Sequence, residues 1–188
     1  MAMPNCQREC KPSRYRAMDA IPQIVAAIEP ADYAAFSELI VEYTNWCRAR
    51  YEDDAWFVDK ALGHQSLEDE LKKLSTVFGP PNGKTLLVRL GDKYLGCGAY
   101  KRLDETTCEM KRVFLRPETR GLGIGRILCT ELMREAKEDG YSLMRLDTGG
   151  RLVEAIKTYE SLGFRNCAPY IEYPPDLMPY LVFMEAPL

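Results

Sequence analysis

The spacing of hydrophobic and polar positions changes several times along the first half of the chain, and each change predicts an element. Residues 24–28 form an apolar run that predicts a strand. Apolar positions then recur at helical spacing over residues 33–51, with Asp32 as the expected helix cap. A second helix is predicted to start at Ser66 and to end at the glycine- and proline-rich residues 79–83. Its apolar stripe consists of Leu67, Leu71, Leu74 and Phe78.

From residue 85 onward the period becomes strand-like before it turns helical again. The pattern predicts an antiparallel meander of three strands, joined by turns at residues 91–93 and 103–106. A helix over residues 123–138, a short strand at 143–146 and a last helix that stops at Gly163 follow. The three meander strands are expected at residues 85–90, 94–101 and 107–115, and two final strands at 165–167 and 180–185.

Length and composition indicate one ordinary globular domain. A chain of 188 residues with 46% hydrophobic and 28% charged residues is long enough for one substantial core, and we expect a flexible tail at residues 1–19 and a domain at 20–188. The formal charge of -3 argues against a general nucleic-acid or membrane-surface binder. No apolar run approaches the roughly 20 residues that span a bilayer, so we expect a cytoplasmic protein.

The cysteines and the histidine do not form a metal-binding pattern. The chain has seven scattered cysteines, no Cys-x-x-Cys pair and a single histidine, His64. Structural zinc sites need four such ligands at short spacings. We therefore expect no metal, and cysteines that act mainly as small buried side chains.

A glycine-rich stretch between a predicted strand and a predicted helix is the strongest candidate for chemistry. Three glycines alternate in it, so that backbone N–H groups can turn toward one point without a Cβ clash. The helix that follows adds unpaired N–H groups and the positive end of its dipole, which favours a phosphate. Neither the Lys-Ser/Thr of a Walker loop nor the glycine spacing of a dinucleotide fold is present. The stretch consists of Arg120, Gly121, Leu122, Gly123, Ile124, Gly125 and Arg126.

Two motifs and the order of the elements resemble the GCN5-related N-acetyltransferase (GNAT) superfamily. The strand Glu-Met-Lys-Arg-Val-Phe-Leu-Arg-Pro at 109–117, followed by Arg-x-x-Gly-x-Gly, is similar to the family's central strand and pyrophosphate loop. The segment 155–164 is similar to its second signature helix, which ends in Leu-Gly-Phe. The resemblance implies an α/β (α+β) single-domain fold, with a central mixed, mostly antiparallel sheet whose central strands splay apart and are flanked by helices.

The resemblance also implies an acyl donor, acetyl-CoA, and the residues that hold it. Backbone N–H groups of residues 120–126 would bind the pyrophosphate. The pantetheine arm would pair with the edge of the central strand at Val113, Phe114 and Leu115, where a ligand satisfies hydrogen bonds that the splayed strand leaves open.

Glu109 and Tyr159 are the candidate base and acid. An amine attacks a thioester only when it is neutral, so a base is needed, and Glu109 stands eleven residues before Arg120, as in the histone-acetylating branch of the superfamily. A regular strand would put Glu109, Lys111, Val113 and Leu115 on one face. Tyr159 occupies the family's tyrosine position and would protonate the departing thiolate. The alternatives are a solvated carboxylate paired with Lys111 or Arg112, and a core tyrosine.

The resemblance implies an acceptor that is a primary amine of a small molecule or peptide. From the net charge we expect no nucleic-acid or membrane partner. Homodimers are common in the family, so a homodimer is admitted by analogy. Asp147 and Thr148 are expected along the acceptor groove, and Tyr170 and Tyr173 either cap the acceptor or pack its loop. Two other functions stay open: a non-catalytic CoA-binding sensor or scaffold module, and a binder of nucleotide phosphates.

Overall fold

The computed structural model describes residues 21–64, 67–119 and 121–188, so the predicted tail, the start of a helix at Ser66 and Arg120 lie outside the described residues. Seven strands form one sheet in the order β1-β2-β3-β4-β5-β7-β6. β4 and β5 pair in parallel and all other neighbours pair antiparallel, which confirms the predicted mixed sheet. The strands are β1 (Gln23–Ala26), β2 (Gly83–Leu90), β3 (Lys93–Arg102), β4 (Thr107–Leu115), β5 (Leu143–Gly149), β6 (Arg165–Asn166) and β7 (Leu181–Pro187).

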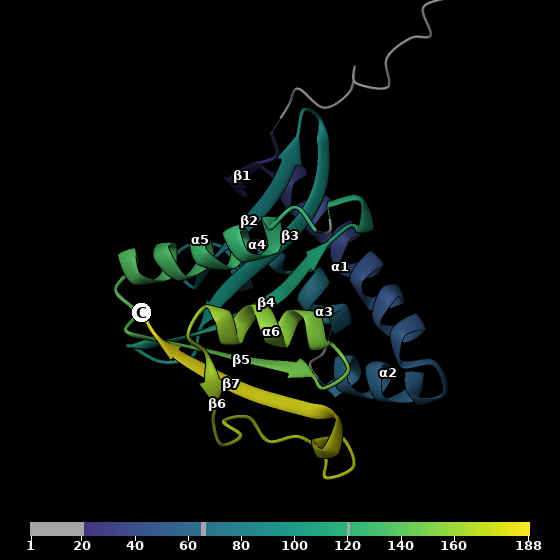
Figure 1. Ribbon diagram of the computed structural model, residues 1–188. Coiled ribbons are helices and arrows are strands. Elements are labelled where there is room, and N and C mark those ends of the chain that lie inside the picture. The colour runs from purple at the N-terminus through teal and green to yellow at the C-terminus, as the bar shows by residue number, and fades with distance from the viewer. Residues whose placement is uncertain (1–20, 65–66, 120) are drawn as a thin grey trace, which may run out of the picture.

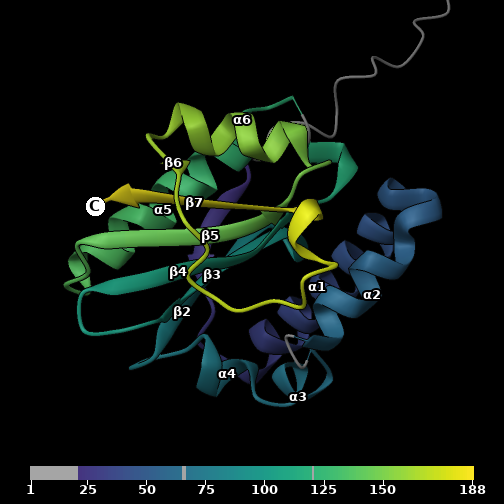
Figure 2. The same cartoon turned by 90° about the horizontal axis from the view of Figure 1, so that it is seen from below.

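Helices cover both faces of the sheet, as Figures 1 and 2 show. On one face α5 (Ile124–Glu138) and α6 (Val153–Ser161) bury Leu128, Leu132 and Tyr159 against the sheet. On the other face lie α1 (Pro30–Tyr51), α2 (Ala55–His64), α3 (Leu67–Leu71) and α4 (Leu74–Val77). Phe36 of α1 and Leu74 of α4 pack there. Among the described helices none is both long and apolar enough to cross a membrane.

The helical segment between α1 and the meander differs from the prediction. α1 ends at Tyr51, as predicted, and Glu52–Asp54 forms one 3-10 turn with φ of 49° at Glu52. The helix α2 that starts after this turn was not predicted. α2 persists because Phe57, Val58 and Ala61 share a buried face. The single helix predicted from Ser66 is instead two short helices, α3 and α4, separated by a turn at residues 72–73.

α1 also starts earlier than its apolar pattern indicates. Glu29 is the N-cap and Pro30 occupies the first turn, where a missing N–H costs nothing. Asp32 sits at the third helical position rather than at the cap, and its Oδ2 accepts hydrogen bonds from the N–H groups of Ile28 and Glu29. The Asp32 carboxylate therefore satisfies N–H groups that precede α1, although Asp32 itself lies inside the helix.

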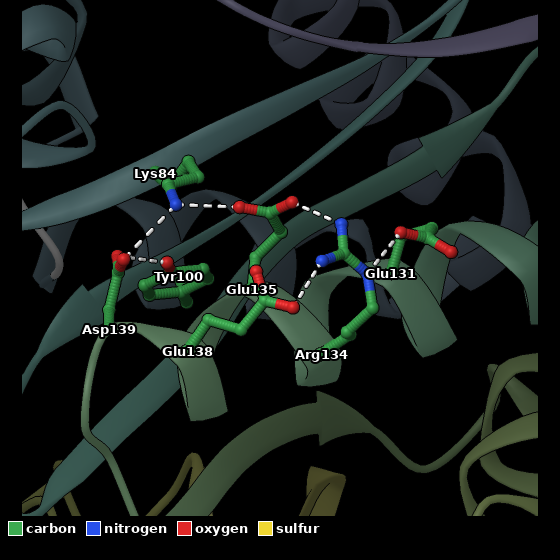
Figure 3. Close-up of polar contacts among 7 residues, drawn as sticks. All are labelled: Lys84, Tyr100, Glu131, Arg134, Glu135, Glu138 and Asp139. Carbon is green, nitrogen blue, oxygen red and sulfur yellow. Dashed lines mark hydrogen bonds and ion pairs between the residues drawn. The ribbon is translucent and has the colours of Figure 1, made fainter.

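A polar network fixes the C-terminal half of α5 to the sheet (Figure 3). Lys84 of β2 donates to Glu135 Oε2 at 2.6 Å and to Asp139 Oδ1 at 3.2 Å, and Tyr100 of β3 donates to the other oxygen of Asp139. Arg134 continues the network along the outer face of the helix to Glu131, Glu135 and Glu138. Because α5 is held at this end, its opposite, N-terminal end has a fixed position beside β4.

β4 and β5 separate after a short parallel pairing. Thr107, Cys108 and Glu109 pair with residues 143–145, and the strands then diverge, as their directions in Figure 1 show. β3 and β7 continue to pair with their outer edges. The sheet is therefore split at its centre, which agrees with the predicted splayed strands.

A bulge in β4 reverses the predicted arrangement of its side chains. Cys97 pairs with Phe114 and Ala99 with Lys111, so Arg112 and Val113 together oppose Gly98. After the bulge, Val113 and Leu115 pack on the α5 side, whereas Lys111 and Glu109 face the opposite side. The prediction that these four residues share one face is wrong, because it assumed a regular strand.

Candidate active site

A cavity of about 570 Å³ occupies the split between β4 and β5. Its walls are the diverging halves of the two strands, the glycine-rich loop, α6, and the inner faces of α1 and α2. Most of the predicted site residues line this one cavity. They are Val113, Phe114, Leu115, Gly121, Gly123, Ile124, Gly125, Arg126 and Tyr159.

The loop has the backbone geometry that an anion cradle needs. Gly121 and Gly123 have φ of 77° and 74°, a region that side chains with a Cβ rarely adopt, and a Cβ added at either would meet nothing within 4 Å. Gly123 is the N-cap of α5 and makes no side-chain capping bond, so the first N–H groups of α5 have no side-chain cap. A phosphate would satisfy them, so the residues present fit the diphosphate of a CoA.

Two predicted members of the loop have a different status. Leu122 is 59% exposed and does not line the cavity, so any contribution it makes is through its backbone. Arg120 lies outside the described residues. Arg126 lines the cavity and donates from Nη1 to Ser161 Oγ at 2.5 Å, which places a cation beside the loop.

Tyr159 projects from α6 into the same cavity, with 7% of its surface exposed. Its ring packs against Phe164, with centroids 5.8 Å apart. Burial raises the pKa of the phenol, and the nearby Cys129 and Asp147 act in the same direction. The hydroxyl therefore keeps its proton at neutral pH and is able to donate it.

Asp147 supplies a carboxylate at the end of the cavity wall formed by β5. Its Oδ1 accepts from Lys111 Nζ at 2.6 Å and its Oδ2 from the Tyr173 hydroxyl at 3.0 Å. Burial opposes ionisation, but Lys111 outweighs it through charge and hydrogen bonding, so the pKa of Asp147 is lowered. Asp147 is thus ionised at neutral pH, and it lines the cavity together with Thr148.

Glu109 lies behind the cavity wall rather than in it. The side chain is fully buried; Oε1 accepts from the Tyr170 hydroxyl at 3.0 Å and lies 3.5 Å from Lys111 Nζ. Oε2 lies 3.3 Å from Lys101 Nζ but has no partner with hydrogen-bond geometry among the described residues. Lys111 therefore stands between Glu109 and Asp147. Burial excludes the alternative of a solvated carboxylate, although the pairing with Lys111 that this alternative named is present.

Arg112 is the cavity residue whose role the sequence did not reveal. The sequence pattern offers it only as a partner of Glu109, but Arg112 lines the cavity and its Nε donates to Glu70 Oε1 at 2.7 Å. The sequence signal that bears on Arg112 is Gly98 on β3, because a glycine inside a strand often marks a bulge.

Tyr170 and Tyr173 are the two loop tyrosines that bond the buried carboxylates: the Tyr170 hydroxyl donates to Glu109 and the Tyr173 hydroxyl donates to Asp147.

No group of three or more histidine, cysteine, aspartate or glutamate side chains that could hold a metal ion is found within the described ranges. Beside the cavity, Lys101 pairs with Glu109, Lys111 with Asp147, and Arg112 with Glu70.

A loop that fits a diphosphate, a split sheet and a buried tyrosine define an enzyme of the acyltransferase class. The chain belongs to the acetyltransferase (GNAT) family, whose model matches residues 33–164. An uncharacterized N-acetyltransferase of Schizosaccharomyces pombe is 38% identical over 128 residues, which cover 66% of this chain and 76% of the relative.

Two solved structures show the same fold. A Klebsiella pneumoniae protein described as an acyl-CoA N-acyltransferase has a TM-score of 0.66 and 31% identity, with 89% of this chain and 98% of that chain covered. A Salmonella typhimurium protein described as an acetyltransferase, solved with acetyl-CoA, has a TM-score of 0.57 and 22% identity, with 89% and 94% covered. At 22% identity, the likeness to the Salmonella typhimurium protein shows the fold alone.

Proposed function

We propose that the protein transfers the acetyl group of acetyl-CoA to a primary amine of a small molecule or peptide, by direct attack within a ternary complex. The observation that carries this proposal is that one cavity is lined by the phosphate-type loop, by the free edge of β4 and by Tyr159. Membership of the acetyltransferase (GNAT) family supports the choice of donor.

The donor would be held mainly by backbone groups of this chain. The N–H groups at Gly121, Gly123 and the start of α5 bind the diphosphate, and Arg126 adds a cation. The edge of β4 at residues 113–115 offers main-chain donors and acceptors to the amide-containing arm. When bound, acetyl-CoA would supply a thioester whose carbonyl carbon is the electrophile for the amine nitrogen.

Tyr159 is proposed as the acid. The raised pKa of the phenol keeps it protonated, and its position in the wall lets it donate to a leaving thiolate. This proton transfer makes the thiolate a better leaving group and is worth typically 10²- to 10⁴-fold in rate.

Glu109 is proposed as the base: the amine proton passes from the cavity through water to its carboxylate, which lies behind the wall. Its carboxylate is linked to the cavity through Lys111, whose Nζ lies 3.5 Å from Glu109 and 2.6 Å from Asp147. Asp147, which lines the cavity, receives the amine. Because its ionised carboxylate raises the pKa of a bound amine, a base has to remove the proton before the amine attacks.

The test is an acyl-transfer assay with acetyl-CoA and a panel of primary amines, in which release of free thiol is followed. The proposal predicts thiol release that depends on both the amine and the protein. CoA binding by calorimetry without turnover on any amine would instead indicate the non-catalytic module. Protection against thermal unfolding by ATP but not by CoA would indicate a nucleotide binder.

A further inference from the structure

Arg112 departs from the conformation expected in a strand. Its φ is 57°, and among the described residues only Glu52 shares a positive φ without being glycine. An arginine at the bulge of a central strand is rarely left-handed, and such outliers concentrate beside active sites, where a bulge redirects a side chain. Here the bulge turns the guanidinium toward α3, where it meets Glu70.

The guanidinium is buried, charged and incompletely satisfied. Its side chain is 4% exposed, and Glu70 engages only Nε, whereas Nη2 has no hydrogen-bond partner among the residues described. Burial disfavours the charged form, yet Glu70 raises the pKa of Arg112, so the charge persists. A buried donor without a partner is costly, and a ligand that accepts from it recovers that cost.

The residues around Arg112 indicate the chemistry of a ligand that would bind it. Arg112 lines the cavity together with Tyr43, Trp46, Phe57 and Val58, which form an apolar and aromatic wall from α1 and α2. Burial raises the pKa of the Tyr43 hydroxyl, and the nearby Arg112 charge opposes that rise, so the two groups lie within electrostatic reach. Asp147, which also lines the cavity, acts in the same direction as Glu70 on the pKa of Arg112.

We propose that the acceptor is an amino acid with an apolar or aromatic side chain, whose carboxylate is bound by Arg112 and whose amine lies toward Asp147. The inference rests on the proposed function and deepens it by naming the substrate class. A guanidinium suits a carboxylate because its N–H groups match the two oxygens. The apolar wall suits the side chain, and the opposite charges of Arg112 and Asp147 suit a zwitterion.

The test uses matched compounds that differ only in the carboxylate. The full chain is first titrated with CoA, and the CoA-bound protein is then titrated with 3-phenylpropanoate and with its neutral amide, 3-phenylpropanamide. The proposal predicts that the carboxylate binds at least about tenfold more tightly than the amide, as expected for a charge-assisted hydrogen bond. Equal affinities, or tighter binding of the amide, would overturn it. Because this comparison is made on the wild-type chain, it does not depend on whether a variant folds.

A paired variant tests whether Arg112 is the group responsible. Arg112→Gln combined with Glu70→Gln removes both charges, so neither partner is left as an unpaired buried ion. The matched control is Arg116→Gln with Glu42→Gln, an ion pair of the same type at the end of β4 that does not line the cavity. The proposal predicts that preference for the carboxylate disappears in the first pair and survives in the second; its persistence in the first would contradict the role of Arg112.

Activity gives an independent reading that separates this inference from the proposed function. L-phenylalanine is expected to have a kcat/KM at least about tenfold above that of 2-phenylethylamine, which lacks the carboxylate. Transfer to 2-phenylethylamine at an equal or higher kcat/KM would overturn the substrate class and leave the acetyltransferase standing. Absence of CoA binding in the first titration would instead refute the proposed function itself.

Discussion

Tyr159 of α6 and Asp147 of β5 line one cavity, and their pKa values are shifted in opposite directions. Burial raises the pKa of the Tyr159 phenol, whereas Lys111 lowers the pKa of the Asp147 carboxyl against the effect of burial. At neutral pH the cavity therefore offers one proton donor and one anion. This division suits a reaction in which an amine must arrive and a thiolate must be protonated.

Replacing Tyr159 with phenylalanine tests the proton donor. We expect kcat to fall by about 10² or more, since general-acid catalysis is typically worth 10²- to 10⁴-fold, with little change in the Kd of acetyl-CoA. Tyr141→Phe is the control, because Tyr141 is buried in the same core but does not line the cavity. Steady-state kinetics and a binding titration measure both quantities, and unchanged turnover in Tyr159→Phe would remove this residue from the mechanism.

Asp147→Asn should weaken the fold in a pH-dependent way. The pKa of Asp147 is lowered in the folded chain, so its stabilising effect is full above the unfolded value of about 4 and is lost as pH falls through the folded value. Breaking the buried pair with Lys111 should cost about 3 kcal/mol at pH 7. Urea unfolding from pH 7 to 3 should show this difference closing below about pH 4, and a constant difference would contradict the assignment.

At the scale of elements, the loop and α5 act together as the anion site. The loop supplies left-handed glycines, and α5 supplies uncapped N–H groups that stay in place because its other end is fixed to β2 and β3. β4 and β5 contribute by separating, since a fully paired sheet would leave neither a cavity nor a free strand edge.

Gly123→Asp and Gly123→Asn separate charge from bulk in the loop. Both side chains are of similar size, both are among those that tolerate a left-handed backbone, and a Cβ at this position has open space. The aspartate adds a negative charge where a diphosphate is expected. We predict that Asp weakens CoA binding at least about tenfold more than Asn does, which calorimetry at fixed ionic strength would measure. Equal affinities in the two variants would show that this loop does not hold the diphosphate.

Lys84→Met tests whether the network of Figure 3 is structural. Lys84 is about one-fifth exposed and bridges two carboxylates of the α5 end, so its loss should cost about 1 kcal/mol and lower Tm by about 2–4 °C. Because none of the network residues lines the cavity, kcat should not change. A large fall in kcat with Tm preserved would point to coupling between the two ends of α5.

At the scale of the whole molecule, the sequence predicted the seven strands and the part of the cavity wall formed by β4, the glycine-rich loop and Tyr159, but not the part formed by α1 and α2. These features depend on local patterns: the change of period at residue 85, the alternating glycines and the helix stripe that carries Tyr159. The bulge at Arg112 could not be predicted in the same way, because it depends on how β4 registers against Gly98. That one register shift decided which side Glu109 faces and which cation reaches the cavity.

The helices before the meander were harder to predict for a related reason. α2 follows an acidic turn that looks like a terminator, and its buried face is defined by contacts with Tyr173 and Leu177 of a segment over one hundred residues away. The burial of Glu109 likewise depends on Tyr170 from the same distant loop. Contacts of this range leave no periodic pattern in either segment.

The most direct measurement is a calorimetric titration of the full chain with coenzyme A. The central claim is that main-chain amides of the glycine turn and of the α5 N-terminus hold a diphosphate beside the split sheet. It predicts saturable binding of one coenzyme A per chain, and a Tm that rises with its concentration. A correctly folded chain that gives no heat of binding and no shift in Tm at millimolar coenzyme A would contradict it.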